Sequence, residues 1–289
     1  MLSSELDICL TEAFQSAREA RHEFVTVEHL LLAIVDTPRV RDILRACGAD
    51  VARLRGDLSD YIDQMTPRLK QGGMTIVTNK YPHNWAYQPS MVEGSPWTDI
   101  RVRKAANLAI DRAGINKLLS GLMIESKGHV YPGHPWFGSP TFDIKYDPAA
   151  AKKLLADAGY SATKKPKIKI AISTSGSGQM LPLPMNEYVQ ENLNAVGFDA
   201  SFEVMEWNAL VTFAFQPATG DNARKAGVNG VNISRATVDP YSAFTRLMNS
   251  NFVPPVGANW GILKDEKLDA MINKAHTSFD KTEQTKALS

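Results

Sequence analysis

Apolar residues in the first segment of the chain recur three and four positions apart, the spacing of one helical face. Four such faces follow one another, each preceded by a residue that can cap or open a helix, so the pattern predicts four short helices. The capping or opening residues are Ser3 or Ser4, Thr26, Pro38 and Asp50. The apolar faces are Leu6, Leu10, Ala13, Phe14 and Ala17; Val27, Leu30, Leu31 and Ile34; Val40, Ile43, Leu44 and Cys47; and Val51, Leu54, Leu58, Tyr61 and Ile62.

Farther along, the pattern alternates between strand and helix. Residues 167–172 alternate apolar and polar side chains as a strand does, and residues 198–204 nearly do so. Between them, residues 183–196 have helical spacing and end at Gly197, so we expect a parallel, right-handed strand–helix–strand unit. Helices are also expected at two Asp-Pro pairs, Asp147-Pro148 and Asp239-Pro240.

The composition changes abruptly near Gly72-Gly73. Residues 1–70 contain eight arginines and one lysine, whereas residues 74–289 contain six arginines and 17 lysines. All five tryptophans and 14 of the 16 prolines follow the break. We therefore predict a helical domain over 1–70, a linker over 71–75 and an α/β domain over 76–289.

Charge and hydropathy exclude several classes of protein. The net charge of +1 leaves no electrostatic footprint for nucleic acid, and no apolar run is long enough to insert in a membrane. Two acids within the first seven residues do not resemble a secretory signal, which predicts a cytoplasmic chain. The two cysteines, Cys9 and Cys47, lie on apolar helical faces and are expected to be buried and reduced.

The run Arg21-His-Glu-Phe-Val-Thr-Val-Glu-His-Leu-Leu-Leu-Ala-Ile34 resembles the N-terminal domain of the Clp ATPase chaperones, the ClpA type in particular. The resemblance covers about Leu2 to Pro67 and implies one four-helix repeat of a domain that holds two in that family. It also implies a docking module for Clp substrates or a ClpS-type adaptor. The docking candidates are His22, Glu23 and Glu28.

Other interpretations of these residues stay open. Glu23 and Glu28 flank a helix N-terminus, where a solvated carboxylate is stabilising without any partner. His29 is expected to be a structural histidine beside the apolar face. A zinc site at His22, Glu28 and His29 is disfavoured because the spacing matches neither zincin pattern, and we predict no metal and no cofactor. No Walker motif occurs in the sequence.

The run Ser95-Pro-Trp-Thr-Asp-Ile-Arg-Val-Arg-Lys-Ala-Ala-Asn-Leu-Ala-Ile-Asp-Arg112 resembles the family 5 extracellular solute-binding proteins, although Trp97 replaces the usual phenylalanine. Residues 146–160 and Asp239-Pro240 provide two further matches in the right order. The resemblance implies a periplasmic-binding-protein-like (type II) α/β lobe from the peptide-binding or nickel-binding component of an ABC importer. It implies an ABC permease as partner for an exported form.

That resemblance also implies a ligand cleft, of which this chain carries the second lobe. Peptide-binding members have an aspartate three residues before the Asp-Pro pair, where this chain has Ala236. Peptide binding is therefore expected to be weak, and Arg235 suits an anionic solute. The cleft candidates are Trp136, Trp207, Arg235, Asp239 and Trp260, with core packing an equal alternative for the tryptophans. His129 and His134 belong to a proline-rich loop expected to frame a pocket.

No nucleophile–base spacing indicates a catalytic triad, so the sequence predicts a non-enzymatic binding protein. Three hypotheses explain why a Clp-like repeat precedes a solute-binding lobe. The chain is an engineered or misassembled chimera without intact function, a natural fusion that serves as a Clp-associated cytosolic adaptor, or a degenerate transport protein. The break near residue 72 favours the chimera.

Overall fold

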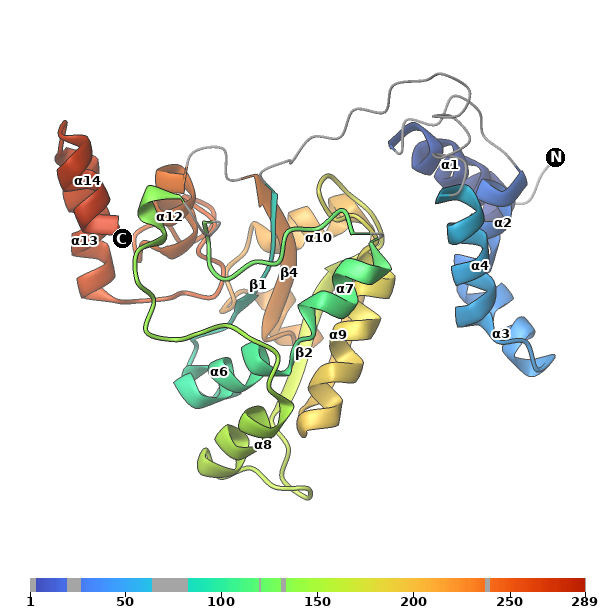
Figure 1. Ribbon diagram of the computed structural model, residues 1–289, viewed down its shortest axis with the longest axis horizontal. Coiled ribbons are helices and arrows are strands. Elements are labelled where there is room, and N and C mark those ends of the chain that lie inside the picture. Colours follow the sequence, from blue (N-terminus) through green and yellow to red (C-terminus); the bar gives the residue numbers. More distant parts are fainter. Residues whose placement is uncertain are drawn as a thin grey trace. The chain divides into compact units, whose positions relative to one another are not determined.

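The computed structural model describes residues 4–19, 27–63, 83–119, 121–130, 134–236 and 240–288 (Figure 1). The chain forms two compact units, residues 1–80 and residues 81–289. The linker predicted at 71–75 lies outside the described residues.

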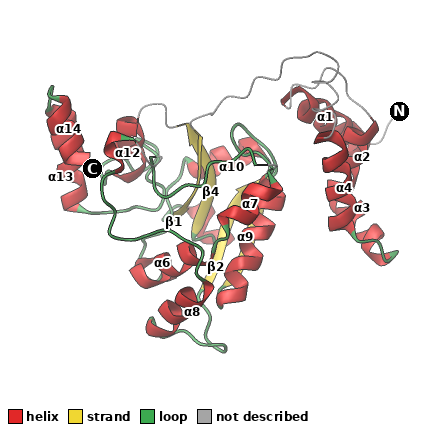
Figure 2. Cartoon of the chain, in the orientation of Figure 1, coloured by secondary structure: helices red, strands yellow, loops and turns green. Residues whose placement is uncertain are grey.

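The first unit contains the four helices that the apolar pattern predicts (Figure 2). They are α1 (Ser4–Glu19), α2 (Val27–Asp36), α3 (Pro38–Ala46) and α4 (Val51–Asp63). Helix α2 packs on the other three. A two-bond ion pair joins the end of α2 to α4, with Arg55 Nε 2.7 Å from Asp36 Oδ1 and Arg55 Nη2 3.0 Å from Asp36 Oδ2.

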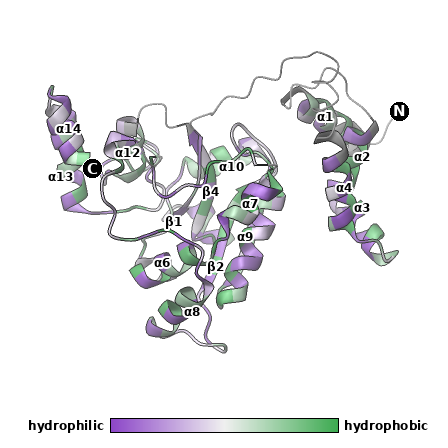
Figure 3. Ribbon diagram, in the orientation of Figure 1, coloured by the Kyte–Doolittle hydropathy of each residue, from purple (hydrophilic) through white to green (hydrophobic). Residues whose placement is uncertain are grey.

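The interior of this unit differs from the predicted one. Small residues of α1 are buried, namely Cys9, Ala13 and Ala17, and His29 on α2 is buried too. The large residues Phe14, Leu31, Ile43 and Leu54 are exposed, and Cys47 is exposed rather than buried. A unit of this size has too little interior to cover every apolar face, so each helix keeps hydrophobic residues at its surface (Figure 3).

The second unit is built on a four-stranded mixed sheet. Its strands are β1 (His83–Pro89), β2 (Lys167–Ser173), β3 (Asp199–Met205) and β4 (Gly230–Ala236), in the order β1-β4-β2-β3. Strand β2 is parallel to β3 and β4, whereas β1 is antiparallel to β4 with His83 opposite Ala236. The predicted parallel unit is confirmed, since α9 (Pro182–Val196) connects β2 to β3 and ends at Gly197, whose φ is +115°. The sequence analysis did not identify β1 or β4.

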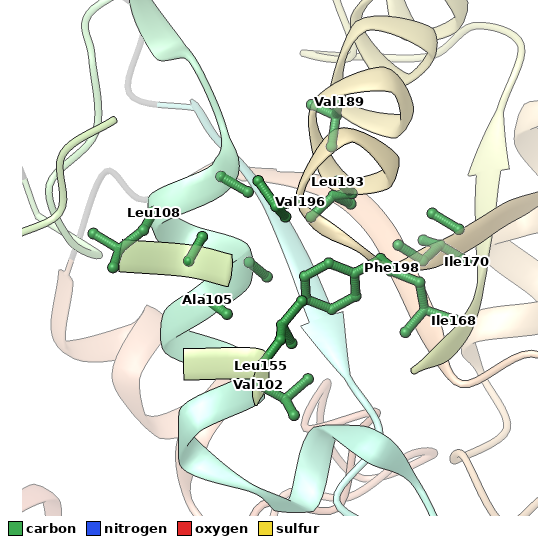
Figure 4. Packing of buried hydrophobic residues seen from close by; sticks show 14 of the residues in the cluster. Val102, Ala105, Leu108, Leu155, Ile168, Ile170, Val189, Leu193, Val196 and Phe198 are labelled. Carbon is green, nitrogen blue, oxygen red and sulfur yellow. The ribbon is translucent and has the colours of Figure 1, made fainter. Parts of the chain in front are cut away.

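Two hydrophobic cores cover the two faces of the sheet. On one face, α6 (Ile100–Ala109), α8 (Pro148–Asp157) and α9 pack around Phe198 and the isoleucines of β2 (Figure 4). On the other, α10 (Trp207–Ala214) packs with Trp260 against Ala171, Val231 and Ile233. The sheet is therefore covered on both faces, which leaves its edges for binding.

Aspartates cap the starts of three helices in this unit. Asp99 Oδ1 accepts the Arg101 N–H at 2.8 Å at the start of α6. Asp111 does the same for Gly114 in α7 (Arg112–Leu118), and Asp147 for Ala150 in α8, each at 3.0 Å. The cap at Asp147 confirms the helix start predicted from its Asp-Pro pair.

Shorter elements complete the unit. They are the 3-10 turns η1 (Pro96–Thr98) and η2 (Pro135–Phe137) and the helices α11 (Asp221–Ala226), α12 (Pro240–Met248), α13 (Glu266–Thr277) and α14 (Lys281–Leu288). Helix α13 packs on α12 and α14, and α14 contacts η2. Within the described ranges, no helix has the length and apolar character needed to cross a bilayer.

Candidate functional site

The candidate site lies at the end of the sheet where β2, β3 and β4 finish and β1 begins, which we call the carboxyl edge. Ser173, Met205 and Ala236 are the last residues of the three parallel strands, and His83 is the first of β1. Ligands of open α/β sheets bind outside the carboxyl ends of parallel strands, because the loops that diverge there leave a crevice. The topology therefore directs the search to this edge.

The loop that follows β2 is shaped by two glycines at this edge. Gly176 and Gly178 have φ angles of +123° and +70°, in the left-handed region that favours glycine. A Cβ atom on Gly178 would lie 1.5 Å from His83 Nδ1, and one on Gly176 would lie 2.3 Å from the ring of Trp207. The loop therefore packs directly against His83 and Trp207. A side chain at either glycine would push the loop away from these two rings.

Ser234 organises the face of the carboxyl edge that carries His83. Its hydroxyl donates to the carbonyl of Ser177 at 2.7 Å and accepts from Gln179 Nε2 at 3.3 Å. His83 Nδ1 is also 3.3 Å from this hydroxyl, and burial lowers the pKa of His83. Gln179 is completely buried, and within the described part of the chain its Oε1 has no hydrogen-bond partner.

The opposite face of the same edge carries a basic group. Asn84 lies directly across the β1–β4 ladder from Arg235, so the two side chains share one face of the sheet. The amide of Asn84 lies 3.3 Å from His129 Nδ1, and the ring of Phe244 on α12 packs beside His129 with centroids 5.2 Å apart. Asn84 thus contacts His129 and faces Arg235 across the ladder.

Burial affects both basic side chains. It lowers the pKa of Arg235, and the nearby charge of Arg246 lowers it further. Burial likewise lowers the pKa of His129. Arg235 Nε and His129 Nε2 are buried nitrogens that make no hydrogen bond with any described residue.

The structure separates the three tryptophans named as cleft candidates. Trp207 lies at the carboxyl edge against Gly176, where a ligand can reach it. Trp260 is fully buried and stacks on Phe213 in the second core, which is the alternative that the sequence left open. Trp136 belongs to η2, which contacts the C-terminal helix α14, and its ring packs on His134. Of the three, only Trp207 joins the candidate site.

Several predicted residues cannot be placed. Asp239, His22 and Glu23 lie outside the described residues, so their roles stay predictions. Glu28 is half-buried in the first turn of α2, where an acidic side chain suits the helix N-terminus. His29 beside it is buried, as a structural histidine would be.

Sequence reasoning missed Asn84 and Gln179 and assigned His129 only to the frame of a pocket. The signal for Asn84 is its place opposite Arg235, which follows from a strand pairing between residues 151 positions apart. For Gln179 the signal is the Gly-Ser-Gly segment before it, a turn tight enough to bury its neighbour.

A cavity of about 450 Å³ lies at the other end of the sheet, which we call the amino edge. Its lining includes Ser90, Lys167, Arg224 and Asn229. Asn229 at this cavity makes three side-chain hydrogen bonds within the protein: Oδ1 accepts from Lys169 N at 3.0 Å and from Trp97 Nε1 at 3.3 Å, and Nδ2 donates to the carbonyl of Lys167 at 3.0 Å. We therefore place the candidate site at the carboxyl edge, where Gln179, Arg235 and His129 have buried polar atoms without a partner among the described residues.

Metal ligands do not gather anywhere in the described ranges, where no three His, Cys, Asp or Glu side chains come together. At the carboxyl edge, the amide of Asn84 and the ring of Phe244 lie beside His129. Polar and aromatic groups of this kind suit the binding of a solute by hydrogen bonds.

The fold and the polar carboxyl edge define a solute-binding lobe. A family model described as bacterial extracellular solute-binding proteins, family 5, matches residues 34–254. The chain belongs to this family. Its members are non-enzymatic binding proteins, which confirms the prediction that the chain is not an enzyme.

Two curated proteins match different parts of the chain. The probable deoxycholate-binding periplasmic protein YgiS of Escherichia coli is 27% identical over 210 residues, which cover 70% of this chain and 36% of YgiS. The ClpA homolog protein of Fuscovulum blasticum is 41% identical over 61 residues, which cover 21% of this chain and 8% of that protein. The chain thus spans about a third of YgiS and a small part of the ClpA homolog.

Solved structures with the same fold bind unlike ligands. NikZ of Campylobacter jejuni, in complex with Ni(L-His), has a TM-score of 0.59 at 20% identity over 74% of this chain and 43% of NikZ. The oligopeptide-binding protein AppA of Bacillus subtilis, in complex with a nonapeptide, has a TM-score of 0.60 at 20% identity over 74% of this chain and 42% of AppA. These likenesses confirm the expected type II α/β fold.

Proposed function

We propose that residues 81–289 bind a small, peptide-like solute at the carboxyl edge, as one lobe of the substrate-binding component of an ABC importer. The observation that carries this proposal is the set of buried polar atoms at that edge with no partner among the described residues, Gln179 Oε1, Arg235 Nε and His129 Nε2. A buried polar group without a hydrogen bond costs roughly 1–3 kcal/mol, so a solute that pairs with such groups at this edge would recover part of that cost on binding.

The shape of the edge supports the same function. The Gly176–Gly178 loop packs on Trp207 and His83, which fixes an aromatic side chain and a polar one beside the ends of β2 and β4. An aromatic surface with a few fixed polar groups is the usual composition of a small-molecule site. YgiS, named for deoxycholate, and NikZ and AppA, solved with Ni(L-His) and a nonapeptide, support a solute as the ligand.

The 289-residue chain is expected to bind peptides weakly by itself. One lobe leaves the solute open to water on the other side, and water screens each polar contact. Residue 236 is an alanine, so it offers no carboxylate to a peptide ammonium group. We expect dissociation constants of about 1 mM for di- and tripeptides. An ABC permease is the partner that this function implies for an exported form.

The test is a chemical-shift titration of the uniformly ¹⁵N-labelled 289-residue chain with deoxycholate, trialanine and Ni(L-His). Saturable shifts are expected at Asn84, Gln179 and Arg235 at the carboxyl edge. The amino edge, followed at Lys167 and Asn229, is the internal control. Shifts confined to the amino edge would contradict the placement, and saturable shifts at neither edge would contradict solute binding.

We also propose that the first unit is a Clp-type docking repeat, because it is 41% identical to part of a ClpA homolog. The exposed apolar residues Phe14, Leu31 and Ile43 give it a surface suited to a protein partner. Calorimetry of the full chain with a ClpS-type adaptor tests this proposal. A double charge reversal of Glu23 and Glu28 should weaken binding, whereas Asp42→Lys on the exposed side of α3 should not. Equal affinity of the double variant would remove the two glutamates from the interface.

A further inference from the structure

The cavity at the amino edge is lined by segments that are far apart in the sequence. The loop after β1 contributes residues between 90 and 96, the loop before β2 contributes residues 165–167, and α11 contributes Arg224. Its volume of about 450 Å³ is within the range of small-molecule sites in proteins. The solute binding proposed for the carboxyl edge makes no use of this cavity.

Positive charge dominates the lining of the cavity. Lys165, Lys167 and Arg224 are its three bases and Glu93 is its single acid, which leaves the lining residues a net charge of +2. Arg224 has an aspartate partner 2.6 Å away in its own helix. Neither lysine forms an ion pair with a described carboxylate, in contrast to Lys169 on β2, which has a glutamate partner 2.6 Å away. The two lysines are therefore the unpaired cations of the cavity.

The hydrogen-bonding groups of the lining are mainly donors. The hydroxyls of Ser90 and Ser95 each accept a backbone N–H at 3.3 Å, so each keeps its own hydrogen for a further acceptor. Asn229 uses its Oδ1 twice within the protein but donates only one of its two amide hydrogens to a described acceptor. An ammonium group donates and never accepts. A ligand with several acceptor atoms therefore fits this lining.

A phosphate group matches both the charge and the donors. As a monoester it has three acceptor oxygens and a charge of about −1.5 to −2 at pH 7. A carboxylate has two oxygens and one charge, so it would leave more of the donors unpaired. A metal ion or a ligand ammonium group would be repelled by the lysines. The ring of Tyr160 and the side chains of Val92 and Pro96 line the same cavity and give it apolar surface for an organic group.

We infer that the amino edge is a second binding site, which takes a phosphate ester of a small organic molecule. Lys165 and Lys167 are its main cationic contacts, and the hydroxyls of Ser90 and Ser95 donate to the remaining phosphate oxygens. This inference goes beyond the proposed solute binding, because it concerns the other edge of the sheet and different residues.

The test is a chemical-shift titration of the ¹⁵N-labelled full chain at pH 7.5 and constant ionic strength. Phenyl phosphate is the probe, inorganic phosphate lacks the organic group, benzenesulfonate carries a single charge, and benzenesulfonamide is neutral. Phenyl phosphate should shift the amide signals of Lys167 and Asn229 saturably, with a dissociation constant of about 1 mM, because exposed charges each contribute little. Inorganic phosphate and benzenesulfonate should bind about threefold more weakly, and benzenesulfonamide should cause no saturable shift.

Three variants test the residues assigned to the site. Lys165→Gln/Lys167→Gln should weaken phenyl phosphate binding about tenfold, because it removes both unpaired cations. Lys152→Gln/Lys153→Gln on the exposed side of α8 changes the net charge equally and should leave the affinity unchanged. Glu93→Gln should strengthen binding about threefold, since it removes the acid of the lining. A damaged fold would not produce such a gain.

Several results would overturn the phosphate site. Equal shifts from phenyl phosphate and benzenesulfonamide would contradict an anion site, and equal affinity of the two double-lysine variants would contradict the role of Lys165 and Lys167. Equal affinity for inorganic phosphate would contradict an ester as the ligand. The absence of a saturable shift at the amino edge would contradict the site itself. The solute binding proposed for the carboxyl edge stands or falls separately, because its ligands and its reporter residues are different.

Discussion

Two polar residues at opposite edges of the sheet, Asn229 and Arg235, differ in how their side-chain atoms are paired. At the amino edge, Asn229 uses its carbonyl twice and its amide once, and so joins Trp97 to the start of β2. At the carboxyl edge, Arg235 and His129 leave buried nitrogens without partners in the described chain. A buried side chain with its hydrogen bonds made stabilises the fold, whereas a buried side chain with unpaired atoms can form hydrogen bonds with a ligand. The contrast predicts which substitutions harm folding and which harm binding.

The largest expected loss of stability follows from a substitution at the amino edge. Asn229→Ala removes three hydrogen bonds and leaves a buried indole N–H without an acceptor. We expect a loss of about 3 kcal/mol in the free energy of unfolding. Urea denaturation measures it, with Asn208→Ala on the exposed start of α10 as the control. A loss below that of the control would show that Asn229 is not a structural residue.

The next largest loss of stability is expected in the loop after β2, which shapes the carboxyl edge. Gly178→Ala should cost about 2 kcal/mol, since it adds a Cβ atom against His83 and strains a left-handed residue. Gly94→Ala is a matched control, because Gly94 has a φ of +84° and open space around it. The difference between the two variants in thermal denaturation isolates the contact with His83. Equal losses of stability in the two variants would mean that the loop moves away from His83 at no energetic cost.

A gain in stability is expected when the charge of Arg235 is removed. Arg235→Met should raise the free energy of unfolding by about 1 kcal/mol, because it removes a largely buried charge that has no partner in the described structure. Arg224→Met, at an exposed position, should leave the free energy of unfolding unchanged. A clear loss of stability in Arg235→Met would indicate that the guanidinium supports the fold.

The smallest effect is a pH dependence. Burial lowers the pKa of His129 and of His83, so below the ordinary histidine pKa of about 6.5 the unfolded chain takes up protons that the folded chain does not. The contribution of these histidines is therefore destabilising below pH 6.5 and absent above it. Denaturation at pH 5.5 and 7.5 should show a smaller pH difference in His129→Asn than in the parent chain. An unchanged difference would mean that His129 titrates alike in both states.

Local patterns predicted the elements that local physics determines. The helix start at Asp147 and the β2–α9–β3 unit follow from neighbouring residues, and the structure confirms them. Strand β4 was missed because Asn232 and Ser234, polar but buried, break the apolar run expected of a strand covered on both faces. Their burial depends on partners far away, such as Asn186 on α9.

The site was harder to predict than the fold. Arg235 was a candidate from sequence, but Asn84, which faces it across the ladder, comes from a distant segment. For Trp260 the sequence left cleft and core open, because an aromatic residue between Asn259 and Gly261 resembles a loop residue and nothing nearby reveals that Phe213 stacks on it. In the first unit the apolar faces were correct as helix signals, but Phe14 and Ile43 were wrong as interior residues.

The pairing of His83 with Ala236 has a mechanical consequence. Strand β1 begins and β4 ends at the same edge, so tension applied at these two residues acts across a single rung and opens the antiparallel ladder one rung at a time. The second rung to part is Asn84 with Arg235, at the candidate site. Single-molecule stretching with handles at His83 and Ala236 should therefore record low-force opening of this edge while the packed core around Phe198 stays folded.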